Sequence, residues 1–137
     1  MCIRDSRIED SLSAVNSARE EGIVPGGGIA LVRSVDSLSS VEVENSDQQA
    51  GVDVIRKAIF EPIRQMAKNA GLSPDLIVSE VQDAEGSSGY DFASGDMVDM
   101  LEAGILDPKK VTKSALQNAV SASGTLITTN HAIVELP

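Results

Sequence analysis

Apolar residues recur every three or four positions over most of this chain, a spacing that predicts helices with one buried face. We expect the first helix over residues 7–21. Gly22 should end it, because glycine adopts the left-handed conformation of a helix C-cap at little cost. Residues 23–28 read Ile-Val-Pro-Gly-Gly-Gly, which predicts a break without regular structure. A second helix is expected over residues 28–39.

The middle of the chain repeats the helical pattern over residues 48–70, with Pro62 inside it. Proline removes a backbone donor and clashes one turn back, so we expect a kink or two abutting helices there. Gly71 should close this segment. Ser73, followed by proline, predicts the start of another helix, with serine as the N-cap.

The last third of the chain mixes turn signals with one more long helix. Residues 86–95 are rich in Gly and Ser and predict a loop with a short hairpin, followed by an apolar turn over residues 97–101. Asp107 is the expected N-cap of a helix from residue 109 to about residue 129. Residues 131–136 predict a strand with an exposed edge. The fold class is therefore mainly α with small β pieces.

Composition narrows the possible functions. The 137 residues carry 11 Lys and Arg against 21 Asp and Glu, a net charge of −10, which argues against a nucleic-acid partner. Aromatic residues make up 2%, so the core must be aliphatic. The single cysteine excludes an internal disulfide, and no apolar run reaches the roughly 20 residues of a membrane helix. We expect a location in the cytoplasm or another reducing compartment, such as an organelle matrix, and no membrane partner.

The glycine corner, Gly26–Gly28, is the most conspicuous candidate for chemistry. Glycine lets the backbone approach a ligand closely, and a helix N-terminus after it favours an anion such as phosphate. The string matches neither the dinucleotide fingerprint nor a Walker loop. Two interpretations stay open: an anion-binding corner, or a tight corner between helices.

The isolated acids each have an ordinary structural explanation. Asp10 lies near the start of the first expected helix, where a solvated acid is favoured. Asp107 is expected to act as an N-cap, and Asp91 would normally be a turn residue. His131 has no carboxylate or cysteine partner at ligand spacing, so we interpret it as structural or exposed.

Several strings in fixed order resemble the C-terminal part of a group I chaperonin, the bacterial and organellar GroEL type. The resemblance covers residues 7–137. It is carried by Arg7-Ile8-Glu9-Asp10, Glu20-Glu21-Gly22-Ile23-Val24-Pro25-Gly26-Gly27-Gly28, Gly89-Tyr90-Asp91, Gly104-Ile105-Leu106-Asp107-Pro108-Lys109-Lys110-Val111-Thr112, Ser114-Ala115-Leu116-Gln117, Thr128-Thr129 and Leu136-Pro137.

The resemblance implies a domain organisation. Residues 7–20 correspond to a helix of the intermediate domain. Residues 21–137 correspond to the second half of the equatorial domain, a helical bundle with a small hairpin and a C-terminal edge strand. Residues 1–6 do not match the family, and we expect them to come from a truncated reading frame or an added expression segment. The first half of the equatorial domain, with its phosphate loop, metal-binding acid and lysine, precedes this segment in the family, as does the apical domain.

The resemblance also implies a nucleotide site. Gly27 matches a nucleotide contact, and Asp107 matches the acid that contacts the ribose. Asp91, Phe92 and Ala93 match the stretch that borders the adenine and ribose. The family often has Asn-Ala where this chain has Asp91-Phe92, so we expect a tighter, more acidic base pocket in which binding relies on backbone groups.

Asp10 is the catalytic residue that the resemblance implies. It matches the carboxylate that swings in with the intermediate domain and orients the water attacking the γ-phosphate. Catalysis would then be positional and electrostatic, as phosphoryl transfer generally is.

The implied function is ATP-dependent folding and refolding of proteins in a ring-shaped chamber. Its cofactor is ATP with Mg²⁺, and the metal ligand falls outside this segment. Implied partners are other subunits in one or two rings of seven, together with a co-chaperonin and unfolded clients that bind through the missing domains. We expect the chain alone not to hydrolyse ATP, because half of the phosphate site is absent.

Two alternatives remain. The chain could be a free-standing, non-enzymatic assembly module whose strand over residues 132–136 pairs with a neighbouring subunit. It could also be an unrelated nucleotide-binding enzyme that uses the glycine corner, which would require a lysine or metal-ligating acid beside that corner.

Overall fold

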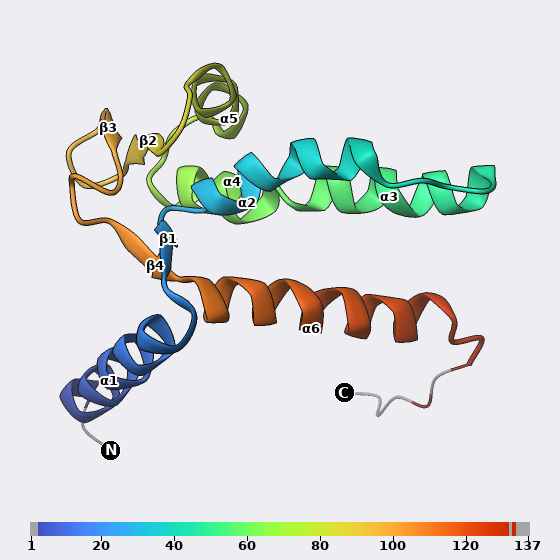
Figure 1. The fold of residues 1–137 in the computed structure, drawn as a ribbon, viewed down its shortest axis with the longest axis horizontal. Helices are drawn as coiled ribbons and strands as arrows, with labels where there is room; N and C mark the ends of the chain where they lie inside the picture. Colours follow the sequence, from blue (N-terminus) through green and yellow to red (C-terminus); the bar gives the residue numbers. More distant parts are fainter. Residues whose placement is uncertain (1–2, 132, 134–137) are drawn as a thin grey trace. The chain divides into compact units, whose positions relative to one another are not determined.

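The structure is a computed structural model that describes residues 3–131 and 133, and it divides into two compact units (Figure 1). We call residues 1–22 together with 108–137 the two-helix unit, and residues 23–107 the core unit. Each is described by itself. None of the helices in the described part of the chain is long and apolar enough to cross a membrane.

The two-helix unit contains α1 (Ile3–Glu21) and α6 (Lys109–Ile127). Helix α1 begins four residues earlier than expected and ends as predicted at Gly22, whose φ is +84° and whose N–H donates to the Ala18 carbonyl at 2.8 Å. The expected cap of α6 is wrong: Pro108 occupies the N-cap position and no side chain caps the helix, because Asp107 still belongs to the preceding strand.

Ion pairs join the two helices of this unit. Lys110 pairs with Glu20, and Lys113 Nζ lies 2.5 Å from Glu21 Oε2. The Lys113 hydrogen bond lowers the pKa of Glu21. No residue whose burial is described in this unit is fully buried, so these contacts lie at the surface and contribute little stability.

The first helical segment of the core unit changes from an α-helix to a 3₁₀ helix. The single helix expected over residues 28–39 is α2 (Ile29–Ser34) followed by a 3₁₀ helix, η1 (Val35–Ser40). The hydroxyls of Ser34, Ser37 and Ser40 each donate to the carbonyl three residues earlier. Serine side chains compete in this way for backbone acceptors, which accounts for the change of helix type.

Proline divides the next helical segment into two, as the sequence predicts. Helix α3 (Ser46–Ala58) is followed by α4 (Glu61–Asn69), which has Pro62 in its first turn. Gly71 ends α4 with a φ of +74°, and the Leu72 N–H donates back to the Ala67 carbonyl at 2.9 Å. Helix α5 (Pro74–Asp83) then begins after Ser73.

Two pairs of short strands complete the core unit. Strand β1 (Ile23–Pro25) pairs with β4 (Leu106–Pro108), so the expectation of no regular structure over residues 23–28 is wrong for the first three. Strands β2 (Ser88–Asp91) and β3 (Asp96–Asp99) form an antiparallel hairpin, as expected, but it extends beyond the predicted residues 86–95. Strand β3 takes up part of the turn expected over residues 97–101.

The expected C-terminal strand falls mostly on residues 132 and 134–137, which lie outside the described part of the chain. Of the expected segment, His131 and Ile133 are described, and neither belongs to a regular element.

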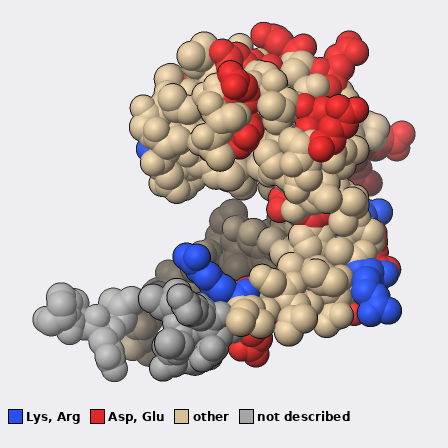
Figure 2. All heavy atoms as spheres, turned by 90° about the vertical axis from the view of Figure 1, so that its left-hand side faces the viewer, with Lys and Arg blue, Asp and Glu red and all other residues tan. Residues whose placement is uncertain are grey.

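The hydrophobic core belongs to the core unit and is aliphatic, as the composition predicts. It is supplied by α2, α4, α5 and the segment after β3. Its buried residues are Ile29, Val32, Ile63, Ala67, Ile77, Val78, Val81 and Met100. Figure 2 shows Asp and Glu gathered over the visible face of the core unit, which agrees with the acidic composition.

Candidate functional site

The glycine corner is packed on its own neighbours. The Gly26 N–H donates to the Ile105 carbonyl at 2.9 Å, and a Cβ on Gly26 would lie 2.9 Å from that oxygen. Gly27 has a φ of +64°, and a Cβ there would lie 2.6 Å from Met100 Cε. Two physical reasons, conformation and close approach, therefore require glycine at Gly27.

Gly28 completes the corner and is the N-cap residue of α2. Its φ is +78°, and a Cβ would lie 3.3 Å from Met66 Cε and 3.4 Å from Ile63 Cβ. Packing thus accounts for all three glycines, which supports the interpretation as a tight corner. The six-residue helix that follows offers only a short dipole to a bound anion.

The β2–β3 hairpin lies directly against this corner. A Cβ on Gly27 would lie 3.9 Å from the Tyr90 carbonyl oxygen, and a Cβ on Gly89 would lie 2.5 Å from Ile29 Cγ1. Close backbone approach at Gly89 brings the start of the hairpin onto the first residue of α2. Residues 91–93, which follow β2's Tyr90, are therefore held near Gly27.

Strand pairing places Asp107 near the same corner. It lies in β4, which pairs with β1, the strand that leads into the glycine corner. The Gly26–Ile105 hydrogen bond extends this connection toward the glycines. Asp107 is half-buried, and burial raises the pKa of its carboxyl. Among the described residues, no hydrogen bond engages that side chain.

Asp91 has the structural role expected of a turn residue. Its carboxylate accepts the Ala93 N–H at 2.8 Å and the Ser94 N–H at 3.3 Å, and these bonds lower the pKa of Asp91. The Phe92 ring packs edge-on against Tyr90, with ring centroids 5.1 Å apart. The side chain of Asp91 is therefore already engaged, while the Phe92 ring is only half-buried.

Asp10 belongs to the two-helix unit and is exposed on α1. The corner that gathers the other predicted residues is made of core-unit residues only. The described residues contain no group of three or more His, Cys, Asp or Glu that could hold a metal ion.

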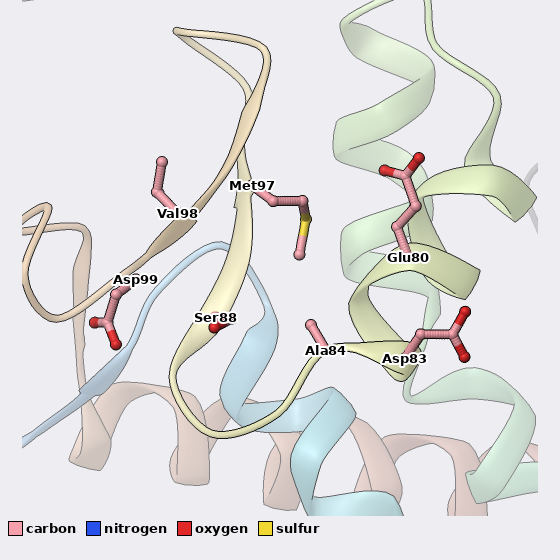
Figure 3. A pocket seen from close by; sticks show the side chains of 7 residues that line it. All are labelled: Glu80, Asp83, Ala84, Ser88, Met97, Val98 and Asp99. Atoms are coloured by element: carbon pink, nitrogen blue, oxygen red, sulfur yellow. The ribbon is translucent and has the colours of Figure 1, made fainter.

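A shallow cavity of about 500 Å³ lies elsewhere in the core unit, between α5 and the hairpin (Figure 3). None of the predicted site residues lines it. Its lining is Glu80, Asp83, Ala84, Ser88, Met97, Val98 and Asp99. The Asp99 carboxylate is engaged by the Ser87 hydroxyl and by the N–H groups of two following residues, which lowers its pKa. No motif in the sequence indicates this cavity, which forms where α5 packs beside the hairpin that follows it in the chain.

Comparison with known proteins gives two findings. The sequence pattern of the TCP-1/cpn60 chaperonin family matches residues 3–137. The fold is similar to a group II chaperonin from Methanococcoides burtonii, described as an open-state monomer, with a TM-score of 0.67 and 24% sequence identity. That match covers 78% of this chain and 28% of the other chain, so this chain spans well under half the length of that protein.

Proposed function

The chain belongs to the TCP-1/cpn60 chaperonin family, and we propose that it is the C-terminal part of an ATP-driven chaperonin subunit of the group I type. The structure is mainly helical with small strand pairs and matches a chaperonin equatorial-domain fragment. Assignment to group I is supported by the strings in residues 7–10, 20–28 and 104–112. The structural similarity at 24% identity indicates a shared fold alone.

The observation that carries the nucleotide proposal is the convergence at the glycine corner. Gly27, the end of β2 and the paired strand β4 come from three separate parts of the sequence and meet inside the core unit. The residues that the resemblance associates with ATP are Gly27, Asp91, Phe92, Ala93 and Asp107. Five positions predicted for one ligand thus lie on neighbouring elements.

These residues would contribute different groups to nucleotide binding. The Asp91 carboxylate holds the hairpin turn, so the base is bordered by the main chain at Phe92 and Ala93 and by the Phe92 ring. The Asp107 carboxylate, which no described group engages, accepts hydrogen bonds from the ribose hydroxyls. Gly27 would contribute its main chain to the ligand, while the space that a Cβ would take is occupied by Met100 of the core.

Asp10 is the proposed catalytic residue, which orients the water that attacks the γ-phosphate. Mg²⁺ bound with ATP would neutralise phosphate charge, and its protein ligand would come from the part of the subunit that precedes this segment in the family. In the intact subunit, ATP binding biases the equilibrium between ring conformations by differential contacts.

The proposed cellular role is protein folding. Subunits would assemble in one or two rings of seven, in the cytoplasm or an organelle matrix. The co-chaperonin and unfolded clients would bind through the domains that this segment lacks. The intact subunit is the full-length polypeptide that carries these residues.

The first test is the mass of the native polypeptide that ends in this sequence. A mass several-fold above 14.3 kDa supports the proposal that the chain is part of a longer ATPase. A mass near 14.3 kDa contradicts it and leaves Asp10, Gly27 and Asp107 as scaffold.

The second test addresses Asp10 in the intact subunit. Asp10→Ala should keep ATP binding and lower turnover by about a hundredfold or more, the scale of a positioned proton-transfer group. Glu9→Ala is the matched control, since it removes the neighbouring exposed acid from the same helix. Steady-state hydrolysis that Asp10→Ala leaves unchanged would remove this residue from the mechanism.

A second candidate function is a free-standing assembly module. The observation that favours it is the exposed apolar stripe on α1, where Ile8, Leu12 and Val15 are 61%, 62% and 58% exposed. Such a stripe favours association with a neighbouring subunit. Co-sedimentation of the 137-residue chain with chaperonin rings would support this role, and a persistent monomer would count against it.

A further inference from the structure

Arg33 connects α2 to the beginning of the hairpin. Its Nε donates to the Gly86 carbonyl at 3.1 Å, and its Nη2 donates to the Ser88 carbonyl at 3.2 Å. The acceptors lie more than fifty positions away in the sequence. Both belong to the main chain, so the contact fixes backbone position and does not depend on which side chains the hairpin carries.

Two points of attachment define where the hairpin lies relative to the glycine corner. One is the packing of Gly89 on Ile29, where a Cβ would lie 2.5 Å from Ile29 Cγ1. The other is the Arg33 contact, one and three residues before Gly89. Packing opposes closer approach of the two elements, whereas the Arg33 hydrogen bonds oppose their separation.

Arginine is the residue suited to this contact. Its planar guanidinium presents several N–H donors in a fixed fork, so it can hold two carbonyls at once, whereas the lysine ammonium acts as a compact point charge. Arg33 is half-buried and, among the described residues, forms no ion pair within 4.0 Å. Its charge therefore acts on the two carbonyls, and hydrogen bonds with a charged donor are the stronger kind.

We propose that Arg33 is a positioning residue for base recognition: it holds the β2–β3 hairpin against α2, and thereby sets the distance between the glycine corner and residues 91–93. This inference rests on the nucleotide site proposed above. Arg33 itself touches no ligand in this scheme. It acts on the base border through the backbone of β2.

The test is nucleotide discrimination by the intact subunit. Arg33→Met keeps the aliphatic stem and removes both hydrogen bonds. Loss of hydrogen bonds from a charged donor should raise the KM for ATP about tenfold. The preference for ATP over GTP should decrease at the same time, because the residues that border the base are displaced. The kcat should change less than about twofold, because the position of the reacting phosphate is not affected. Arg33→Lys, which can keep one of the two bonds, should fall between wild type and Arg33→Met.

The matched control is Arg56→Met. Arg56 is an exposed arginine on α3, and its described ion pair is with Asp53 of the same helix at 3.8 Å. This substitution makes the same change of charge and side chain without affecting a contact between elements. It should leave the KM and the ATP preference unchanged.

A second readout needs no nucleotide. Amide hydrogen exchange of the 137-residue chain should be faster at Gly89 and Tyr90 in Arg33→Met than in wild type or Arg56→Met, because the hairpin opens locally. Where Arg33→Met does not fold, Arg33→Lys and Arg33→Gln take its place in both measurements.

The outcomes separate this inference from the function on which it rests. Faster hairpin exchange together with a lower ATP preference supports it. Faster exchange with an unchanged ATP preference overturns it, since Arg33 would then stabilise the hairpin and nothing more. Failure of the unmutated intact subunit to bind ATP would refute the nucleotide proposal itself, and would do so in wild type before any Arg33 variant is examined.

Discussion

Replacing Gly89 with alanine tests the close approach on which the candidate site depends. Gly89 is buried in β2, and its backbone lies against two core side chains. An added Cβ would lie 2.5 Å from Ile29 Cγ1, 2.6 Å from Ile29 Cδ1 and 3.0 Å from Met100 Cε. Its φ is not in the left-handed region, so the substitution adds a steric clash without backbone strain.

The expected cost follows from the burial of these neighbours. Ile29 and Met100 are 0% and 1% exposed, so neither can move without disturbing the core. Overpacking of a closed core costs about 1–3 kcal/mol. Gly89→Ala should therefore lower the free energy of unfolding of the core unit by that amount. Ile29→Val removes Cδ1 and should relieve part of the clash with the added Cβ. The double variant Gly89→Ala/Ile29→Val should therefore lose less free energy of unfolding than the sum of the losses in the two single variants.

Tyrosine fluorescence is the suitable assay. Tyr90 is the only tyrosine, the chain contains no tryptophan, and this residue lies beside Gly89 in the hairpin. Urea unfolding followed at Tyr90 reports the core unit directly. Gly51→Ala is the control, because a Cβ there meets nothing within 4 Å and the residue lies inside α3. It should stabilise by roughly 0.5–1 kcal/mol, the gain from replacing a helical glycine.

The two glycine substitutions should shift the urea midpoint in opposite directions. Equal midpoints for Gly89→Ala and wild type would refute the close packing of β2 on α2. Strict additivity with Ile29→Val would show that any destabilisation arises elsewhere. Either result would remove the geometric basis for placing residues 91–93 beside Gly27.

Two further predictions concern a cap and the pH dependence of stability. Asn45→Ala should cost about 1 kcal/mol in the same urea assay, since the Asn45 side chain accepts the N–H groups of Asp47 and Gln48 at the start of α3, and Asn45→Asp should retain most of that stability. Burial raises the pKa of Asp107 above its unfolded value of about 3.9. Between the unfolded and the folded pKa, the folded state keeps a proton that the unfolded state loses, so the free energy of unfolding falls as the pH rises through this range. Asp107→Asn should therefore raise the urea midpoint at pH 7 but not at pH values below about 3.9. Hydrogen bonds lower the pKa of Asp99, so Asp99→Asn should lower the urea midpoint at pH 7 and lose this effect in acid. The same direction of change for both variants would contradict these assignments.

Features set by neighbouring residues were predictable from the sequence. Pro62 divides α3 from α4, and Gly71 ends α4 in a left-handed conformation, because both effects operate within one helical turn. The turn role of Asp91 was predictable for the same reason, since its carboxylate bonds to the N–H groups two and three residues later.

Features that depend on distant segments were mispredicted or missed. The break over residues 23–28 contains β1 because β4 supplies a partner strand some eighty positions away. Asp107 fails to cap α6 because it belongs to that strand pair. The two carbonyls that Arg33 contacts have no sequence signal, since any residue supplies a backbone carbonyl.

The sequence by itself determined the helical class, the helix ends at Gly22 and Gly71, the aliphatic core and the family strings, because these depend on residue type and short spacing. The tertiary structure alone decided why the glycines are needed and which residues share a corner. Gly27 makes room for Met100, and Gly89 makes room for Ile29. Such close approach is a property of two backbone segments packed together, so it exists only once the core has formed.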